Sequence, residues 1–167
     1  MEKSVVKKSI GNAINSTKVL SGAAVAGMGS GIFLLHDTKS SFYSLPSLAV
    51  GIVSSSRIGE LKGFARAAAL FEKGAGIDED AEKILKRLDR VEKFGIVPSL
   101  GSLVLGITWM RYFKDTTDTI ISGGMLLMSA SMYAVRSYTS TFVSSVKQID
   151  RGIKDRIAAL RENAKWN

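Results

Sequence analysis

The chain has 167 residues, 46% of them hydrophobic, and carries 23 Lys and Arg against 15 Asp and Glu, a formal charge of +8. It has no cysteine, which excludes disulfides and thiolate metal sites. This length suits one compact unit, so we expect a single domain over residues 1–167. Lys and Arg attract the phosphate of nucleic acid and of anionic lipid alike, so the position of the charges along the chain has to decide between them.

Four long stretches contain no Asp, Glu, Lys or Arg, at residues 19–36, 40–56, 94–110 and 119–135. A helix of about 17 residues rises about 25 Å, the short end of what spans a hydrocarbon core. Four such stretches are hard to arrange in a soluble protein, whose helices need a polar face toward water. We therefore predict an all-α integral membrane protein with four transmembrane helices as two hairpins. The alternative is a soluble helical bundle, favoured by the short stretches and by seven serines in 40–56.

The first stretch, "VLSGAAVAGMGSGIFLLH", has two other readings that we do not favour. A cleaved signal fits poorly, because the stretch is long, rich in glycine and followed by three more. A phosphate-binding loop at "GMGSG" would need a preceding strand and a Lys or Ser/Thr at a set offset, which the sequence does not offer.

The basic residues predict the orientation. Residues 1–18 carry four Lys and Arg, residues 57–93 carry nine and residues 136–167 carry seven, while the two short turns hold the remaining three. With four crossings the three basic segments fall on one side, which the positive-inside rule assigns to the cytoplasm or its topological equivalent. We expect both termini on that side.

Small residues recur every four positions in the uncharged stretches. Such strips let two membrane helices approach closely, so we predict that they pack against neighbouring helices. The predicted helix-packing residues are Gly22, Ala23, Gly27, Gly31, Ser47, Gly51, Ser55, Ser102 and Gly106.

Amphipathic helices are expected to extend from the spans. Apolar residues at steps of three and four predict a cytoplasmic helical hairpin over 57–93, with Gly95 and Pro98 kinking the chain where it re-enters the membrane. Residues 1–18 resemble an amphipathic segment at the membrane surface. Residues 136–167 are predicted to form a long amphipathic C-terminal helix.

The C-terminal helix carries the predicted partner-binding residues. An apolar stripe in water needs a cover, which the 57–93 hairpin, a second copy of the chain, another protein or the membrane surface could supply. The stripe consists of Phe142, Val146, Ile149, Ile153 and Leu160.

The two halves of the chain share a layout that suggests a duplicated hairpin. Asp37 and Thr38 precede Arg57 by about the same distance as Asp115 and Thr116 precede Arg136. Chance is the alternative, since the match rests on few residues.

Reactive groups are scarce. The one histidine, His36, lies at the end of an uncharged stretch, and the acids of "DEDAE" at 78–82 fit the start of a helix better than a cation site. We expect no catalytic residue, cofactor, metal ligand or small-molecule substrate. Coupled transport is disfavoured as well, because transporters usually keep charged residues within their spans.

These observations favour a non-enzymatic, basic, multi-pass membrane protein that serves as a structural or accessory subunit of a larger assembly. The expected partners are the lipid bilayer, including anionic lipid, and other membrane subunits or copies of the chain, whereas nucleic acid is not expected. One alternative is a small homo-oligomeric, holin-like pore lined by the serine-rich second span. The other is a protein that shapes membranes through short hairpins.

Overall fold

The computed structural model describes residues 3–38, 41–72, 79–112 and 115–165. This part of the chain contains four α-helices and no strand: α1 (Lys3–Thr38), α2 (Ser41–Glu72), α3 (Glu79–Tyr112) and α4 (Thr116–Lys165). The prediction of an all-α protein is therefore confirmed. At 1.5 Å per residue, the 50 residues of α4 make it about 75 Å long.

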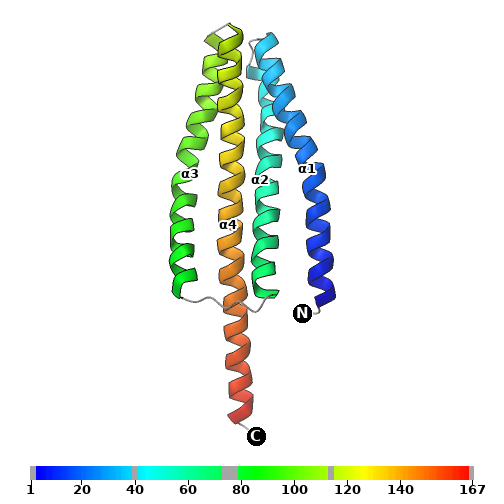
Figure 1. Cartoon of the computed structure of the whole chain (residues 1–167), viewed down its shortest axis with the longest axis vertical. Helices are drawn as coiled ribbons and strands as arrows, with labels where there is room; N and C mark the ends of the chain where they lie inside the picture. The colour runs from blue at the N-terminus through cyan, green and yellow to red at the C-terminus, as the bar shows by residue number, and fades with distance from the viewer. Residues whose placement is uncertain (1–2, 39–40, 73–78, 113–114, 166–167) are drawn as a thin grey trace.

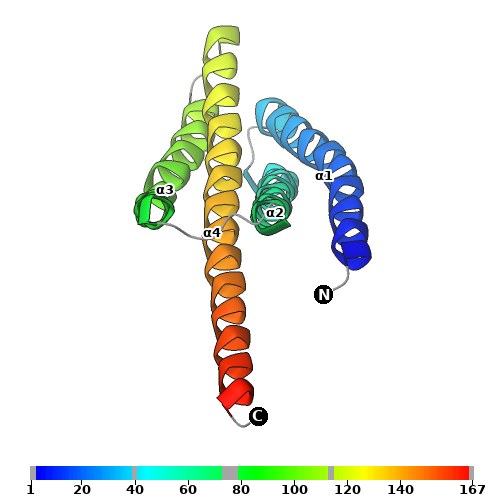
Figure 2. The ribbon, with the colours of Figure 1, turned by 60° about the horizontal axis from the view of Figure 1, so that its bottom comes forward.

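The helices run up and down, and buried side chains from all four, among them Met28, Leu48, Met110 and Leu126, meet in one apolar cluster. Toward the N-terminus of α1 the helices spread into an open layer (Figure 1). α1 packs on α2, α2 packs on α4, and α4 packs on α3, while α1 barely touches α3 or α4. Figure 2 shows the same order, with α2 and α4 in the centre and α1 and α3 at the edges. The two central helices run in the same direction, so the fold consists of two hairpins joined through their second helices.

All four uncharged stretches lie in the same half of this layer. α1 and α3 reach the end of the molecule at Thr38 and Tyr112, and α2 and α4 start from that end at Ser41 and Thr116 (Figure 1). We call this the turn end and the adjoining region the uncharged half, made of residues 19–36, 41–56, 94–110 and 119–135. The other half, where the N-terminus lies, carries most of the charged residues.

One helical segment of the described residues, Asn15–Asp37 in α1, is long and apolar enough to cross a membrane by length and composition. This is a hint of membrane association. The other three stretches do not meet the same measure, so the four-span arrangement stays a prediction.

The boundaries of the helices differ from those we expected at two points. α1 runs without a break from Lys3 to Thr38, so residues 3–18 are continuous with the first uncharged stretch instead of separate from it. α3 likewise continues through Pro98, because a proline costs one backbone hydrogen bond in a helix that packing on α4 supports along its length. A kink bends a helix without ending it, so the kink at Gly95 and Pro98 stays a prediction.

The expected hairpin over 57–93 is not packed on itself. α4 lies between its two arms, and the turn at 73–78 falls outside the described residues (Figure 1). Ala67 and Phe71 of α2, together with Leu85 and Leu88 of α3, form a cluster around Phe142, Val143 and Val146 of α4. The apolar faces of both arms thus cover part of the stripe of α4.

Candidate functional site

The interface between α1 and α2 is built on glycine. A β-carbon on Gly27 would lie 2.6 Å from the backbone nitrogen of Gly51 and 2.8 Å from the carbonyl oxygen of Ser47. A β-carbon on Gly31 would lie 2.6 Å from the side chain of Leu48, and one on Gly51 would lie 2.5 Å from that of Met28. Any residue other than glycine would push the two helices apart at these positions.

The remaining predicted packing residues of the first hairpin are less enclosed. Gly22 is exposed, and a β-carbon there would meet nothing within 4 Å, so it does not pack within this chain. Ala23 and Ser55 are half-buried, and the hydroxyl of Ser55 donates to the carbonyl oxygen of Gly51 in its own helix at 2.8 Å. Of the two small-residue strips on α1, only the strip through Gly27 and Gly31 faces α2.

The second hairpin uses a glycine at the corresponding place. A β-carbon on Gly106 of α3 would lie 2.9 Å from the side chain of Leu126 of α4. The buried hydroxyl of Ser122 donates to the carbonyl oxygen of Gly106 at 2.6 Å, whereas the predicted packing residue Ser102 is half-buried. The same sequence separation divides Gly27 from Gly106 and Arg57 from Arg136. The two hairpins therefore match at their packing glycines as well as in the layout that suggests duplication.

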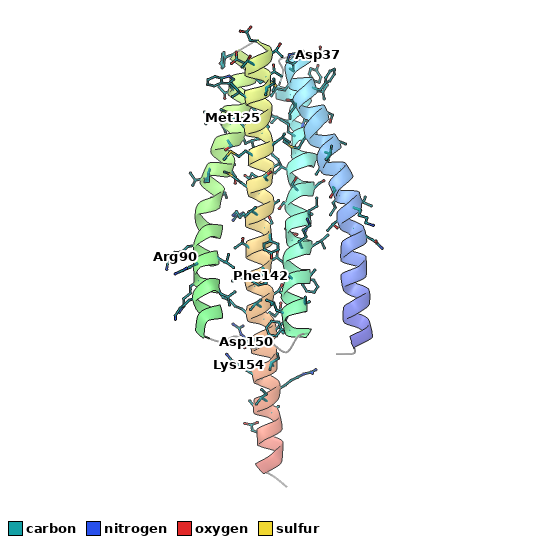
Figure 3. The ribbon with its side chains drawn as sticks, in the orientation of Figure 1. Asp37, Arg90, Met125, Phe142, Asp150 and Lys154 are labelled. Atoms are coloured by element: carbon teal, nitrogen blue, oxygen red, sulfur yellow. The ribbon has the colours of Figure 1, made fainter. Side chains whose placement is uncertain are left out.

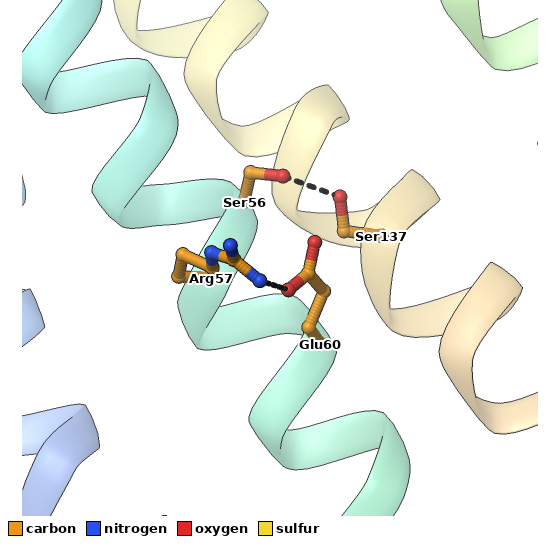
Figure 4. A network of polar contacts seen from close by, with 4 residues as sticks. All are labelled: Ser56, Arg57, Glu60 and Ser137. Carbon is orange, nitrogen blue, oxygen red and sulfur yellow. Dashed lines mark hydrogen bonds and ion pairs between the residues drawn. The ribbon is translucent and has the colours of Figure 1, made fainter. Parts of the chain in front are cut away.

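The contact between α2 and α4, which we call the central seam, joins the two hairpins. The hydroxyls of Ser56 and Ser137 form a hydrogen bond of 2.6 Å across it (Figure 4). A β-carbon on Gly59 would collide with the carbonyl oxygen of Ala134, and one on Gly63 would collide with that of Tyr138. At the rim of the seam, Arg57 pairs with Glu60 at 2.5 Å within α2 (Figure 4).

Sequence reasoning left several of these contacts unassigned. The four-residue repeat of Gly51, Ser55 and Gly59 predicted close packing at Gly59 but did not name the partner helix, and Gly63 continues that repeat into the charged half. Nothing in the sequence pairs Ser56 with Ser137. A serine in an apolar stretch can bond to its own helix or to a neighbour, and the local pattern is the same in both cases.

The interior of the uncharged half is rich in hydroxyls. Ser44, Ser54, Ser99, Ser122 and Ser129 are all buried. The hydroxyl of Ser129 donates across the second hairpin to the carbonyl oxygen of Ser99 at 2.7 Å. No buried side-chain nitrogen or oxygen in the described part of the chain lacks a hydrogen-bond partner. Hydroxyls that are satisfied within the protein let the helices pack closely and leave no polar group to face an apolar surrounding.

Large apolar side chains lie on the outside of the same half. Most of the exposed large hydrophobic side chains belong to this half. Among the described side chains, those outside it are Phe64, Tyr112, Ile153 and Ile157. Phe33, Val50, Val97 and Ile120 are each at least half exposed in the uncharged half. Large apolar side chains in this half therefore lie on the outside as well as inside, where Met28, Leu35, Leu48, Met110, Leu126 and Ala130 form a buried cluster.

The partner-binding stripe of α4 is covered over part of its length. Val146 is buried, and Phe142 and Ile149 are half-buried against the other helices (Figure 3). Ile153 is exposed, as are all described side chains from 151 to 159, because α4 continues beyond the ends of α2 and α3 (Figure 1). The side chain of Leu160 lies outside those that the structure describes. Asp150 and Lys154 form an ion pair of 2.7 Å along this projecting part (Figure 3).

Among the described residues, no group of three or more His, Asp or Glu side chains stands close enough to hold a metal ion. Near the turn end, the indole nitrogen of Trp109 donates to a carboxylate oxygen of Asp118 at 3.0 Å and ties α3 to α4. The arrangement is suited to holding helices together and to presenting an apolar surface.

No protein-family model matches the chain, and neither the curated proteins nor the solved structures include one that is detectably similar to it.

Proposed function

We propose that this chain is a non-enzymatic membrane protein with four spans, which serves as a structural or accessory subunit of a larger membrane assembly. In this proposal the uncharged half lies in the bilayer, and both termini lie on the cytoplasmic or equivalent side. The helices of the charged half, with the projecting end of α4, lie outside the bilayer and meet partners there.

The apolar outer surface of the uncharged half carries the proposal. In the uncharged half, hydroxyls such as Ser122 and Ser129 are inside and bonded, while large apolar side chains such as Phe33 and Val97 are outside. In water, an exposed apolar surface of this extent would favour aggregation. In a bilayer, acyl chains cover it at no cost, and close packing on small residues becomes the main source of helix association.

Burial and length in α1 agree with this proposal. Only 28% of the most apolar window in Asn15–Asp37 is buried, whereas the core helix of a soluble protein would be mostly buried. The uncharged stretches are about 25 Å long as helices, so the bilayer would thin slightly around them or the adjoining Lys and Arg side chains would reach toward the headgroups.

The role as a subunit rests on the projecting end of α4. Ile153 and Ile157 are one turn apart and 44% and 45% exposed. An isolated helical end of this length is marginally stable in water, so a partner that covers the two isoleucines would also stabilise the helix.

Cross-linking in the native membrane tests the role as a subunit. A cysteine at Ile157, in a chain that has no other cysteine, should give one defined higher-mass product with a thiol-reactive cross-linker. The control is a cysteine at Thr117, which is exposed at the opposite end of the molecule. Only monomer at Ile157, or the same products at both positions, would contradict the proposal.

The two alternatives give different results in lipid. A homo-oligomeric pore would produce reproducible unitary currents in a planar bilayer, and a membrane-shaping protein would tubulate liposomes. The structural-subunit proposal predicts neither. The buried hydroxyls support it against a pore within one chain, because Ser99, Ser122 and Ser129 bond to backbone carbonyl oxygens and do not line an opening.

A further inference from the structure

α3 lies at the edge of the layer and packs chiefly on α4 (Figures 1 and 2). Its buried residues, among them Leu85, Ser99, Gly106 and Met110, all face that contact. The opposite side of α3 therefore has no helix of this chain against it. Figure 3 shows Arg90 on this outer side, pointing away from α4.

Five exposed residues follow one line along the outer side of α3, and we call them the outward stripe: Lys83, Arg90, Val97, Val104 and Arg111. They are seven residues apart, so each lies only about 20° around the helix from the one before it. None of the acidic residues of α3 occupies a position in this series. The stripe is thus basic at one end, apolar in the middle and basic again at the turn end.

The spacing of the stripe matches the dimensions of a bilayer. Arg90 and Arg111 are about 32 Å apart along the helix, close to the ~30 Å thickness of a hydrocarbon core. Between them, Val97 is 69% exposed and Val104 is 60% exposed. If Val97 and Val104 face acyl chains, then Arg90 lies at the depth of the headgroup phosphates, which its long side chain can reach.

The basic end of the stripe carries more positive charge than one arginine. Arg87 lies within one turn of Arg90 on α3, and both side chains are exposed. Clustered basic side chains at the headgroup level attract lipids with a net negative charge more than zwitterionic lipids. The apolar surface directly above the cluster favours a phosphate that carries acyl chains over a free phosphate.

We propose that the outward stripe of α3 binds an acidic phospholipid, with its headgroup phosphate against Arg87 and Arg90 and its acyl chains along Val97 and Val104. This inference rests on the proposed membrane location and adds a lipid class and a place for it. The bound lipid would anchor the free edge of the layer, where α3 has no neighbour on its outer side.

Lipid-selective quenching tests this inference. A cysteine replaces Val97 in the full-length protein, carries a fluorescent label, and is reconstituted in zwitterionic phosphatidylcholine vesicles. Nitroxide-labelled phosphatidylglycerol is then compared with nitroxide-labelled phosphatidylcholine as the quencher. We expect the acidic lipid to associate about five-fold or more strongly, since each basic residue near the surface contributes roughly that factor.

The matched variants locate the effect. Replacing Arg87 and Arg90 with Gln should bring the ratio of the two quenchers close to one. Replacing Arg151 and Arg156 with Gln changes the net charge by the same amount on the projecting end of α4, and should leave the ratio unchanged. Both control residues are exposed, as Arg87 and Arg90 are.

Each other outcome contradicts a defined part of the account. Equal quenching by both lipids in the parent would overturn lipid selectivity and leave the membrane location standing. A preference that persists without Arg87 and Arg90, or that is lost equally in the control, would overturn the assignment to this cluster. If neither lipid quenches the label, Val97 does not face acyl chains, and the proposed membrane location fails with the inference.

Discussion

Gly27 of α1 and Gly51 of α2 lie so close that a β-carbon on Gly27 would be 2.6 Å from the backbone nitrogen of Gly51. Replacing Gly27 with Leu should therefore separate the helices and lower the free energy of unfolding by about 1–3 kcal/mol or more. Replacing Gly22 with Leu on the same helix adds the same side chain in open space and should have little effect. Unfolding of the two variants in detergent measures the difference. Equal stability of the two variants would contradict the packing of Gly27 against α2.

Close packing at the central seam predicts that adding one methyl group there destabilises the protein. Alanine is the better helix former, so Gly124→Ala, at an exposed position of α4 with nothing within 4 Å, should stabilise the protein by about 0.5–1 kcal/mol. Gly59→Ala should instead destabilise it, because the new methyl group meets the carbonyl oxygen of Ala134. The opposite signs are the test. Stabilisation by both substitutions would contradict close packing of α2 on α4.

The buried hydroxyls allow a test of their hydrogen bonds. Ser129→Ala removes the bond to the carbonyl oxygen of Ser99 in another helix and should cost about 0.5–2 kcal/mol, the range measured for such bonds between membrane helices. Ser131 is exposed and bonds to Leu127 within its own helix, so Ser131→Ala should be nearly neutral. Unfolding in the same detergent compares the two. A larger loss at Ser131 would be inconsistent with the interior described for this half.

The four helices follow from the sequence more directly than their arrangement does. Charge-free stretches and steps of three and four predicted where helices would form, and the acids at 78–82 predicted the helix start that the structure has at Glu79. The stripe of α4 left its cover open among the 57–93 hairpin, a second copy of the chain, another protein and the membrane surface, and the sequence could not choose among them. In the structure both arms of that hairpin pack on α4.

The sequence also could not show which glycines of α1 pack against α2. Two strips with identical spacing run along α1, through Gly22 and through Gly27, and the sequence has no means to choose between them. The choice depends on the partner surface: Gly51 and Leu48 of α2 fit against Gly27 and Gly31. Such complementarity depends on the surfaces of both helices, and the sequence of one helix does not identify its partner. The hydrogen bond between Ser56 and Ser137 was not predicted for the same reason.

The projecting end of α4 should be less protected than the part that packs. Val146 is buried among α2 and α3, so Val146→Asp should unfold the charged half, whereas Ile157→Asp should leave the isolated protein unchanged. Amide hydrogen exchange should be slow near Val146 and faster beyond residue 151, where the described side chains are exposed. In the native assembly, exchange beyond 151 should slow down. Equally fast exchange with and without the assembly would contradict partner binding at this end.

Cysteine labelling from the two sides of the membrane tests the four-span account most directly. Single cysteines at Ser4, Thr117 and Asn163 place one thiol at each end of the layer and one near the C-terminus, in a chain without other thiols. The account predicts that an impermeant maleimide labels the Thr117 position on intact cells, and labels the Ser4 and Asn163 positions only after permeabilisation. Labelling of all three positions to the same extent before and after permeabilisation would contradict it.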